Sequence, residues 1–129
     1  MPISNQDPTR EGRFAQQLKK GILEMLVLQL LASAPSHGYE MILRLRETSG
    51  GLLDLKEGTL YPILYRLEDE GCIESAWQNM AEKDPKSRAM PRKVYTMTQT
   101  GRQTLQAEKA AWRTFAGCVT NFCGGDQDE

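Results

Sequence analysis

Few residues in this chain have the types and spacing that catalysis or metal binding requires. The sequence contains one histidine, His37, and three cysteines, Cys72, Cys118 and Cys123. The cysteines are odd in number and lack the paired spacing of a zinc site. We find no glycine-rich phosphate loop and no pair of carboxylates at a spacing suited to acid–base catalysis. We therefore expect no catalytic residues, no metal and no cofactor, and we interpret His37 as a turn residue packed against the core.

The chemistry that the chain does offer is local positive charge. Five basic and two acidic residues lie between Glu82 and Lys93, whereas the whole chain of 129 residues has a net charge of −1. A phosphate backbone responds to the charge nearest to it rather than to the sum over the chain. This segment therefore predicts contacts with DNA phosphates, made by Lys83, Lys86, Arg88, Arg92 and Lys93.

The segment Lys56–Gly71 predicts a helix that would present further polar side chains. Its buried face is indicated by helical spacing of Leu60, Ile63, Leu64 and Leu67. We expect Thr59 to be the N-cap, Pro62 to lie in the first turn and Gly71 to end the helix. An ordinary core helix fits the same spacing. The small, uncharged outer half also suits a DNA major groove, with contacts from Lys56, Gly58, Thr59, Tyr61, Tyr65 and Arg66.

Two helices are expected before this segment. Residues 1–15 are polar and predict a mobile arm, and Gln16–Ser33 predicts a helix that is apolar nearly all round. A small domain can bury such a helix more easily with the help of a partner chain. Pro35 and Gly38 predict a turn, and a second helix is expected over Tyr39–Thr48, with Tyr39 facing inward. Helix, turn, helix, connector and helix is the plan in which the third helix reads DNA.

Two strands are expected after the third helix. β-branched and aromatic residues predict strands at about Ile73–Gln78 and Arg92–Met97. The intervening segment is polar and basic and contains Pro85 and Pro91, which is typical of a loop. The strands and loop are consistent with a β-wing that contacts DNA, or with a plain hairpin that has a solvated tip.

Residues 98–123 predict a final helix that begins at a Thr98 cap. A heptad-like apolar seam runs along it, and Glu108 is its one polar member. Since the preceding elements already form a core, we expect a homodimer interface from Leu18, Ile22, Leu105, Trp112, Phe115, Val119 and Phe122. Trp112 has two interpretations, as packing within that interface or as a stacking platform for a flat aromatic ligand. The second gives a candidate effector site of Met25, Trp112 and Phe115.

Taken together, these segments resemble the PadR family of bacterial winged-helix transcriptional regulators, in particular its short members with one C-terminal helix. The resemblance covers about Leu18–Phe122 and is carried most specifically by HGYE at His37–Glu40 and EGTLYP at Glu57–Pro62. It implies a homodimeric repressor that binds an inverted-repeat operator. It also implies, for some members, a phenolic or multidrug ligand that releases DNA.

The expected fold is mainly α with a small β-wing. We divide it into the arm at 1–15, a winged helix-turn-helix at 16–97, a dimerisation helix at 98–123 and an acidic disordered tail at 124–129. The alternative function is a winged helix that contacts other proteins and not DNA. The longest apolar run, Ile22–Ala32, is too short to span a membrane. Because the N-terminal residues do not resemble a signal peptide, we expect a cytoplasmic protein without membrane contact.

Overall fold

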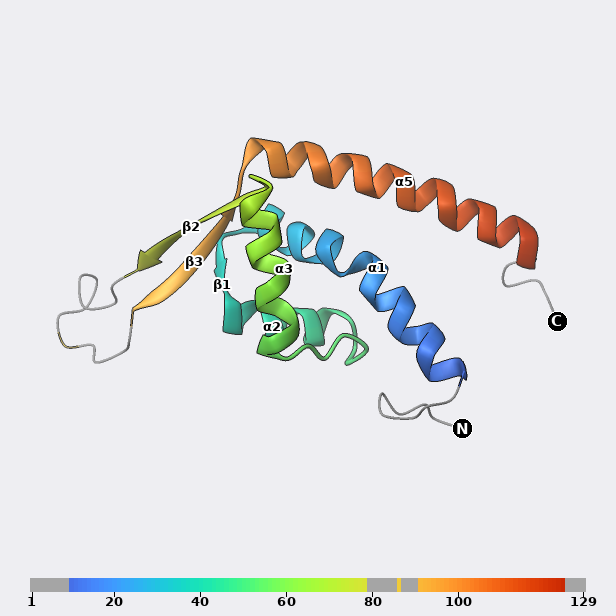
Figure 1. The fold of residues 1–129 in the computed structure, drawn as a ribbon, viewed down its shortest axis with the longest axis horizontal. Helices are drawn as coiled ribbons and strands as arrows, with labels where there is room; N and C mark the ends of the chain where they lie inside the picture. The colour runs from blue at the N-terminus through green and yellow to red at the C-terminus, as the bar shows by residue number, and fades with distance from the viewer. Residues whose placement is uncertain (1–9, 79–85, 87–90, 125–129) are drawn as a thin grey trace.

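The computed structural model describes residues 10–78, 86 and 91–124. A three-stranded antiparallel sheet of order β1-β3-β2 lies beside a group of helices, and β2 and β3 extend away from them (Figure 1). The elements are α1 (Arg10–Ser33), β1 (Ser36–His37), α2 (Gly38–Thr48), α3 (Glu57–Asp69), β2 (Ile73–Gln78), β3 (Arg92–Met97) and α5 (Gln99–Cys123). The predicted fold class, a winged helix-turn-helix with a long C-terminal helix, is confirmed.

One hydrophobic core joins α1, α2, α3 and the sheet. The predicted buried face of α3 is confirmed, because Leu60, Ile63, Leu64 and Leu67 are all buried. Removing apolar side chains of this size from water stabilises a fold by about 1.5–3 kcal/mol each. The other buried apolar residues are Leu23, Val27, Leu28, Leu31, Met41, Ile42, Leu45, Leu53, Cys72, Ile73, Tyr95, Met97 and Leu105.

The first helix is longer than the sequence suggested. It begins at Arg10 rather than Gln16, so residues 10–15 are helical and do not belong to an arm. Residues 1–9 of the expected arm and 125–129 of the expected tail lie outside the described residues. In the C-terminal half of α1 the chain itself buries Leu23, Val27, Leu28 and Leu31. The N-terminal half exposes Phe14 and Leu18, at 61% and 50% of their surfaces.

The segment between α1 and α2 contains a short strand instead of a simple turn. Ser36 and His37 form β1, in which His37 pairs with Val94 of β3. The helix α2 then starts at Gly38, one residue earlier than expected. Its buried residues include Met41 and Leu45, whereas Tyr39 is 62% exposed. The prediction that Tyr39 faces inward was therefore wrong, because Met41 takes the inward position in that turn.

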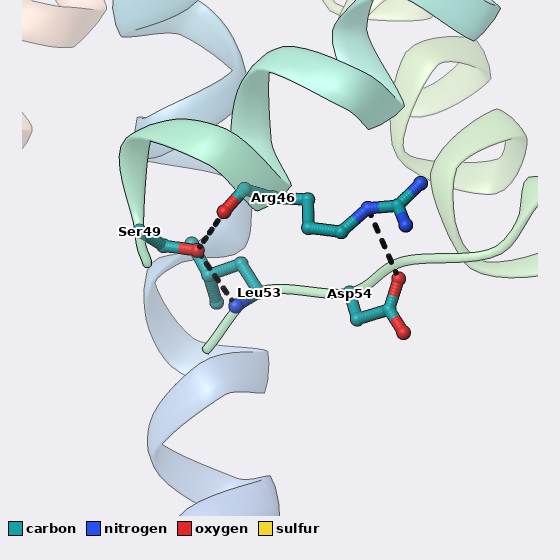
Figure 2. A network of polar contacts seen from close by, with 4 residues as sticks. All are labelled: Arg46, Ser49, Leu53 and Asp54. Carbon is teal, nitrogen blue, oxygen red and sulfur yellow. Dashed lines mark hydrogen bonds and ion pairs between the residues drawn. The ribbon is translucent and has the colours of Figure 1, made fainter. Parts of the chain in front are cut away.

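The connector between α2 and α3 is fastened to the end of α2 (Figure 2). The Ser49 hydroxyl donates to the Arg46 carbonyl at 3.2 Å and accepts from the backbone N–H of Leu53 at 2.8 Å. One carboxylate oxygen of Asp54 lies 3.7 Å from Nε of Arg46 in an exposed ion pair. Since Leu53 is buried, these contacts anchor the connector that leads into α3.

The third helix starts earlier than predicted. Lys56 is the N-cap and makes no side-chain cap, while its carbonyl accepts from the N–H groups of Thr59 and Leu60. Thr59 is therefore the third helical residue and not the N-cap. Pro62 is the sixth, beyond the first turn, and has no N–H to donate to the carbonyl of Gly58.

The end of α3 has the hydrogen bonds of a Schellman motif. The N–H of Cys72 donates to the carbonyl of Leu67 at 2.9 Å, and the N–H of Gly71 donates to that of Glu68 at 3.0 Å. Gly71 has a φ of 79°, which glycine adopts without strain. The expectation that Gly71 ends the helix is met, although the last residue assigned to the helix is Asp69.

The start of α5 docks on this turn. Thr98 is the N-cap, as predicted, and its Oγ1 accepts from the N–H of Gly101 at 3.1 Å and donates to the carbonyl of Gly71 at 2.6 Å. The Thr98 N–H donates to the carbonyl of Cys72 at 3.0 Å. A Cβ at Gly101 would lie 2.1 Å from that same carbonyl oxygen, so only glycine permits this approach.

The rest of α5 first lies beside α1, and the two helices then diverge toward the C-terminal end of α5 (Figure 1). Leu105 is 4% exposed and belongs to the core of its own chain, which corrects its assignment to a dimer interface. The expectation that the preceding elements form the core without this helix was therefore wrong for its first half, which contacts α1 and β3. The exposed apolar residues beyond Leu105 are Trp112, Phe115, Val119 and Phe122.

Candidate functional site

A groove of about 730 Å³ lies where α2, α3 and the sheet meet, and we call it the wing groove. It brings Tyr61 and Tyr65 of α3 together with Arg92 and Lys93 of β3, four residues that the sequence proposed as DNA contacts. The lining residues that the sequence reasoning did not propose as contacts include His37 of β1, Tyr39 at the start of α2 and Trp77 of β2. The full lining is His37, Gly38, Tyr39, Tyr61, Tyr65, Trp77, Pro91, Arg92, Lys93 and Tyr95.

The charged side chains among these lining residues are Arg92 and Lys93, and both are cations. Lys93 Nζ lies 5.9 Å from the ring centroid of Tyr95, a cation–π distance. Burial of Tyr95, followed by the nearby Tyr61, Glu68 and Tyr65, raises its pKa to about 12. Tyr95 is therefore a neutral core residue beneath the groove. The lining offers positive charge, N–H and hydroxyl donors and aromatic faces. Groups of these kinds contact the phosphates and bases of nucleic acid.

Gly38 explains how α2 and α3 approach each other at the bottom of this groove. A Cβ at Gly38 would lie 2.5 Å from the hydroxyl oxygen of Tyr61. Tyr61 is half-buried against the core, and its ring centroid is 6.4 Å from that of Tyr65 at an interplanar angle of 37°. Tyr65 is 60% exposed. Tyr61 thus packs against the core, whereas Tyr65 is the tyrosine of α3 that projects outward.

Trp77 and Tyr39 make the rim of the groove aromatic. Trp77 is 70% exposed on β2 and is paired across the sheet with Lys93. The sequence signal for Trp77 was its strand position opposite a basic residue, but the pairing could be known only once the register of β2 and β3 was fixed. Tyr39 projects from the first turn of α2, next to His37.

His37 is half-buried, and its ring nitrogens contact two different elements. Nδ1 accepts from the backbone N–H of Glu40 at 3.3 Å and so caps α2. Nε2 lies 3.2 Å from Nη1 of Arg92 on β3. The interpretation of His37 as a turn residue did not include its contact with the wing strand.

Other residues of α3 turn toward α1 instead of the wing groove. Gly58, Thr59 and Arg66 line a second groove of about 450 Å³ between α1, the connector and α3. Arg66 Nη2 lies 2.6 Å from the Glu24 carboxylate of α1, and Nε donates to the same oxygen at 2.7 Å. The charge of Arg66 is thus already paired within the chain.

The remaining proposed DNA contacts lie apart from both grooves or outside the described residues. Lys56 is exposed at the start of α3, and Lys86 is exposed in the segment between β2 and β3. Lys83 and Arg88 are in the part of that segment that the structure does not describe.

A third groove, of about 580 Å³, separates α1 from α5 and contains the proposed effector residues. Met25, Trp112 and Phe115 all line it, together with Leu18 and Ile22 of the expected dimer interface. Glu108 also lines it and has a buried Oε1 without a hydrogen-bond partner. Burial raises the pKa of Glu108, and the carboxylates of Glu24 and Glu70 raise it further.

Among residues 10–78, 86 and 91–124, no three His, Cys, Asp or Glu side chains are grouped so that they could hold a metal ion. None of the helices described here is long and apolar enough to cross a membrane.

Comparison with known proteins places this architecture among bacterial regulators. The Negative transcriptional regulator PadR of Bacillus subtilis is 30% identical over 84 residues, which are 65% of this chain and 43% of that protein. The chain therefore spans less than half of that relative. The crystal structure of a PadR family transcriptional regulator from Eggerthella lenta is 29% identical with a TM-score of 0.74, covering 88% of this chain and 92% of the other.

A second solved structure agrees with the first. The PadR-like transcriptional regulator from Bacillus cereus is 29% identical with a TM-score of 0.69, covering 85% of this chain and 99% of the other. Residues 27–107 match the sequence profile of the Transcriptional regulator PadR-like family. This match begins within α1 and ends in the first third of α5, and so includes the whole wing groove. The chain belongs to the PadR-like family of transcriptional regulators.

Proposed function

We propose that this protein is a homodimeric, cytoplasmic transcriptional repressor that binds operator DNA through the wing groove and the exposed face of α3. The observation that carries the proposal is the meeting of Tyr65 with Arg92 and Lys93 in one groove. In helix-turn-helix regulators the recognition helix contacts base edges, and cations on neighbouring elements contact phosphates. A dimer with two-fold symmetry would place two such surfaces on the half-sites of an inverted repeat.

The proposal of a dimer is supported by the apolar surface that one chain leaves exposed. Trp112, Phe115 and Phe122 expose 44%, 62% and 87% of their surfaces, and Phe14 and Leu18 are exposed on the facing helix α1. An apolar stripe over two neighbouring helices is typical of an interface between subunits. Repression is supported by the name of the Bacillus subtilis relative, a negative regulator.

Binding of the protein to duplexes from its own promoter region tests the proposal. Fluorescence anisotropy would measure affinity over a series of salt concentrations. Arg92→Ala should weaken binding and reduce the salt slope by about one unit, since roughly one counterion is released per phosphate contact. Arg113→Ala removes the same charge from an exposed position of α5 and is the matched control.

The alternative is a winged helix that binds another protein and not DNA. It predicts no salt-dependent binding of any promoter duplex. Equal effects of Arg92→Ala and Arg113→Ala would likewise argue against the wing groove as the DNA-binding surface.

We further propose a planar aromatic or phenolic effector in the groove between α1 and α5. Trp112 and Phe115 offer aromatic faces there, and Met25 can adapt its shape to different ligands. Such an effector can release DNA only if it binds the DNA-free arrangement more tightly, so operator DNA must weaken its binding by the same factor.

The two tryptophans of the chain, Trp77 and Trp112, allow this second proposal to be tested by fluorescence. A panel of aromatic cations and phenolic acids should include compounds that quench the Trp77→Phe variant, in which Trp112 is the reporter. The same compounds should not quench Trp112→Ala. Absence of quenching across the panel would leave Trp112 with a packing role, and equal ligand affinity with and without operator would exclude a switch.

A further inference from the structure

The ring of His37 faces one hydrogen-bond donor at each of its nitrogens. Nδ1 lies 3.3 Å from the backbone nitrogen of Glu40, and Nε2 lies 3.2 Å from Nη1 of Arg92. A backbone N–H and a guanidinium can donate but cannot accept. A neutral imidazole has one acceptor nitrogen and one N–H. His37 can therefore accept from Glu40 or from Arg92, but not from both.

The contact with Glu40 is the one that the fold requires. The N–H of Glu40 belongs to the first turn of α2, where backbone donors have no partner within the helix, and Nδ1 supplies one. Arg92 is exposed and can donate to water instead. The ring should thus carry its hydrogen on Nε2, which directs an N–H toward the guanidinium of Arg92. Two donors then face each other over 3.2 Å.

The sheet keeps this pair in place. His37 is paired with Val94, and Arg92 lies two residues before Val94 on the same strand. Side chains two apart on a strand project from the same face, so His37 and Arg92 are diagonal neighbours. The nearest carboxylate of α2, Glu40, accepts from the Ser36 hydroxyl at 2.7 Å and does not line the wing groove. The lining carries Lys93 as a further cation and no acidic residue.

We propose that His37 Nε2 and Arg92 donate together to one backbone phosphate of bound DNA. This inference rests on the proposed DNA-binding function. An anionic oxygen between the two groups accepts from both and so replaces a contact between donors with two hydrogen bonds to a charged acceptor. Because the same ring caps α2, the phosphate is positioned relative to α2 and β3 at once. His37 thereby becomes a DNA-contact residue and Arg92 its partner.

His37→Asn separates this role from the capping role. Asparagine is among the best N-caps, so the variant keeps an acceptor for Glu40, but its side chain is too short to reach Arg92. Operator affinity should fall roughly tenfold, since a hydrogen bond to a charged group is lost. The melting temperature should stay unchanged. His37→Ala loses the cap as well, so it should lower both the melting temperature and the affinity.

A double-mutant cycle with Arg92→Ala tests whether the two residues act on one phosphate. The probe is a fluorescein-labelled duplex that the wild-type protein selects from genomic fragments. In the Arg92→Ala background, the effect of His37→Asn should shrink by at least about threefold, because coupled residues are not additive. Full additivity, or wild-type affinity of His37→Asn, would overturn the inference while leaving DNA binding intact. Failure of the wild-type protein to select any duplex would instead overturn the proposed function.

The single histidine allows a direct second measurement. Protein labelled with ¹⁵N in the histidine ring gives one imidazole spin system, whose nitrogen shifts identify the atoms that carry hydrogen. The free protein should show hydrogen on Nε2, and the complex with the duplex should retain it with a changed shift. A complex in which Nε2 is without hydrogen would contradict the proposal, because that nitrogen could not donate to phosphate.

Discussion

The close approach of α2 to Tyr61 of α3 depends on Gly38. A Cβ there would meet the Tyr61 hydroxyl at 2.5 Å, so the ring of Tyr61 would have to move into the wing groove. We expect Gly38→Ala to lower the free energy of unfolding by about 1–3 kcal/mol, as overpacking does. Urea denaturation measures this change.

Gly58→Ala is the matched control, because it makes the same glycine-to-alanine change at a different position. Gly58 is helical, and a Cβ there would meet nothing within 4 Å, so the variant should gain up to about 1 kcal/mol from helix propensity. If Gly58→Ala proved as destabilising as Gly38→Ala, the close contact with Tyr61 would not be the cause. A stable Gly58→Ala protein with weakened operator binding would support entry of this part of α3 into the major groove.

Glu108 gives stability a pH dependence of definite sign. Burial raises the pKa of this carboxyl above its value in the unfolded chain. Its contribution to stability is therefore fully present below the unfolded pKa and is lost as pH rises through the folded pKa. We expect Glu108→Gln to raise the melting temperature at about pH 7 and to change it little at about pH 4.

An exposed carboxylate, that of Glu74, provides the control for the Glu108→Gln prediction. Glu74→Gln removes a carboxylate from an exposed position of β2 and should not reproduce the pH-dependent gain. Equal melting temperatures of Glu108→Gln and wild type at both pH values would show that the buried Oε1 carries no penalty.

Among the elements, α3 and the wing should contribute to DNA binding in different ways. Tyr65 projects from α3, whereas Lys86 is an exposed residue between β2 and β3. Base contacts discriminate between sequences, and phosphate contacts do not. Tyr65→Ala should therefore change affinity by different factors for different operator sequences. Lys86→Ala should weaken all of them alike and lower the salt slope by about one unit. A sequence-selective Lys86→Ala with a uniform Tyr65→Ala would reverse these roles.

The elements that sequence predicted well are those whose signal is local. Leucine and isoleucine spacing gave the buried face of α3, and alternation with β-branched residues gave β2 and β3 at their observed bounds. Thr98 was identified as a cap because its hydroxyl has a standard partner three residues on. The start of α3 was missed because Lys56 makes no side-chain cap and Thr59 offered a misleading one.

The features that sequence could not supply depend on contacts between distant segments. The two residues of β1 form a strand only because β3 lies beside them. Arg66 and Glu24 are 42 residues apart, and nothing in either segment indicates their ion pair. The wing groove likewise required the sheet register, which brings His37 and Trp77 next to the predicted cations. Four of the ten lining residues were therefore predicted as residue types, but their arrangement was not.

For the whole molecule, the exposed part of α5 should control assembly. Val119 is 44% exposed between Phe115 and Phe122 on the apolar stripe. An aspartate at this position would have to be desolvated in an apolar interface, at a cost of several kcal/mol per dimer. We expect Val119→Asp to sediment as a monomer at micromolar concentration if the wild type is a dimer.

Asn121→Asp introduces the same charge on the opposite face of the helix and should remain dimeric. A Val119→Asp protein that is fully dimeric would show that the apolar stripe is not the interface. Both variants should keep the melting behaviour of the core, because neither position contributes to the buried cluster.

The attachment of α5 to the turn after α3 has a mechanical consequence. Thr98 hydrogen-bonds to the carbonyls of both Gly71 and Cys72, and Gly101 packs directly against the Cys72 carbonyl. These contacts clamp one end of α5 to the turn. Its 25 residues make an arm of about 37 Å at 1.5 Å per residue. A tilt of about 5° at the clamp moves the free end by about 3 Å at that arm length. Because Leu105 also holds the first half of α5 in the core, a change in the direction of this arm would have to be accommodated by α1 and by the turn after α3 together.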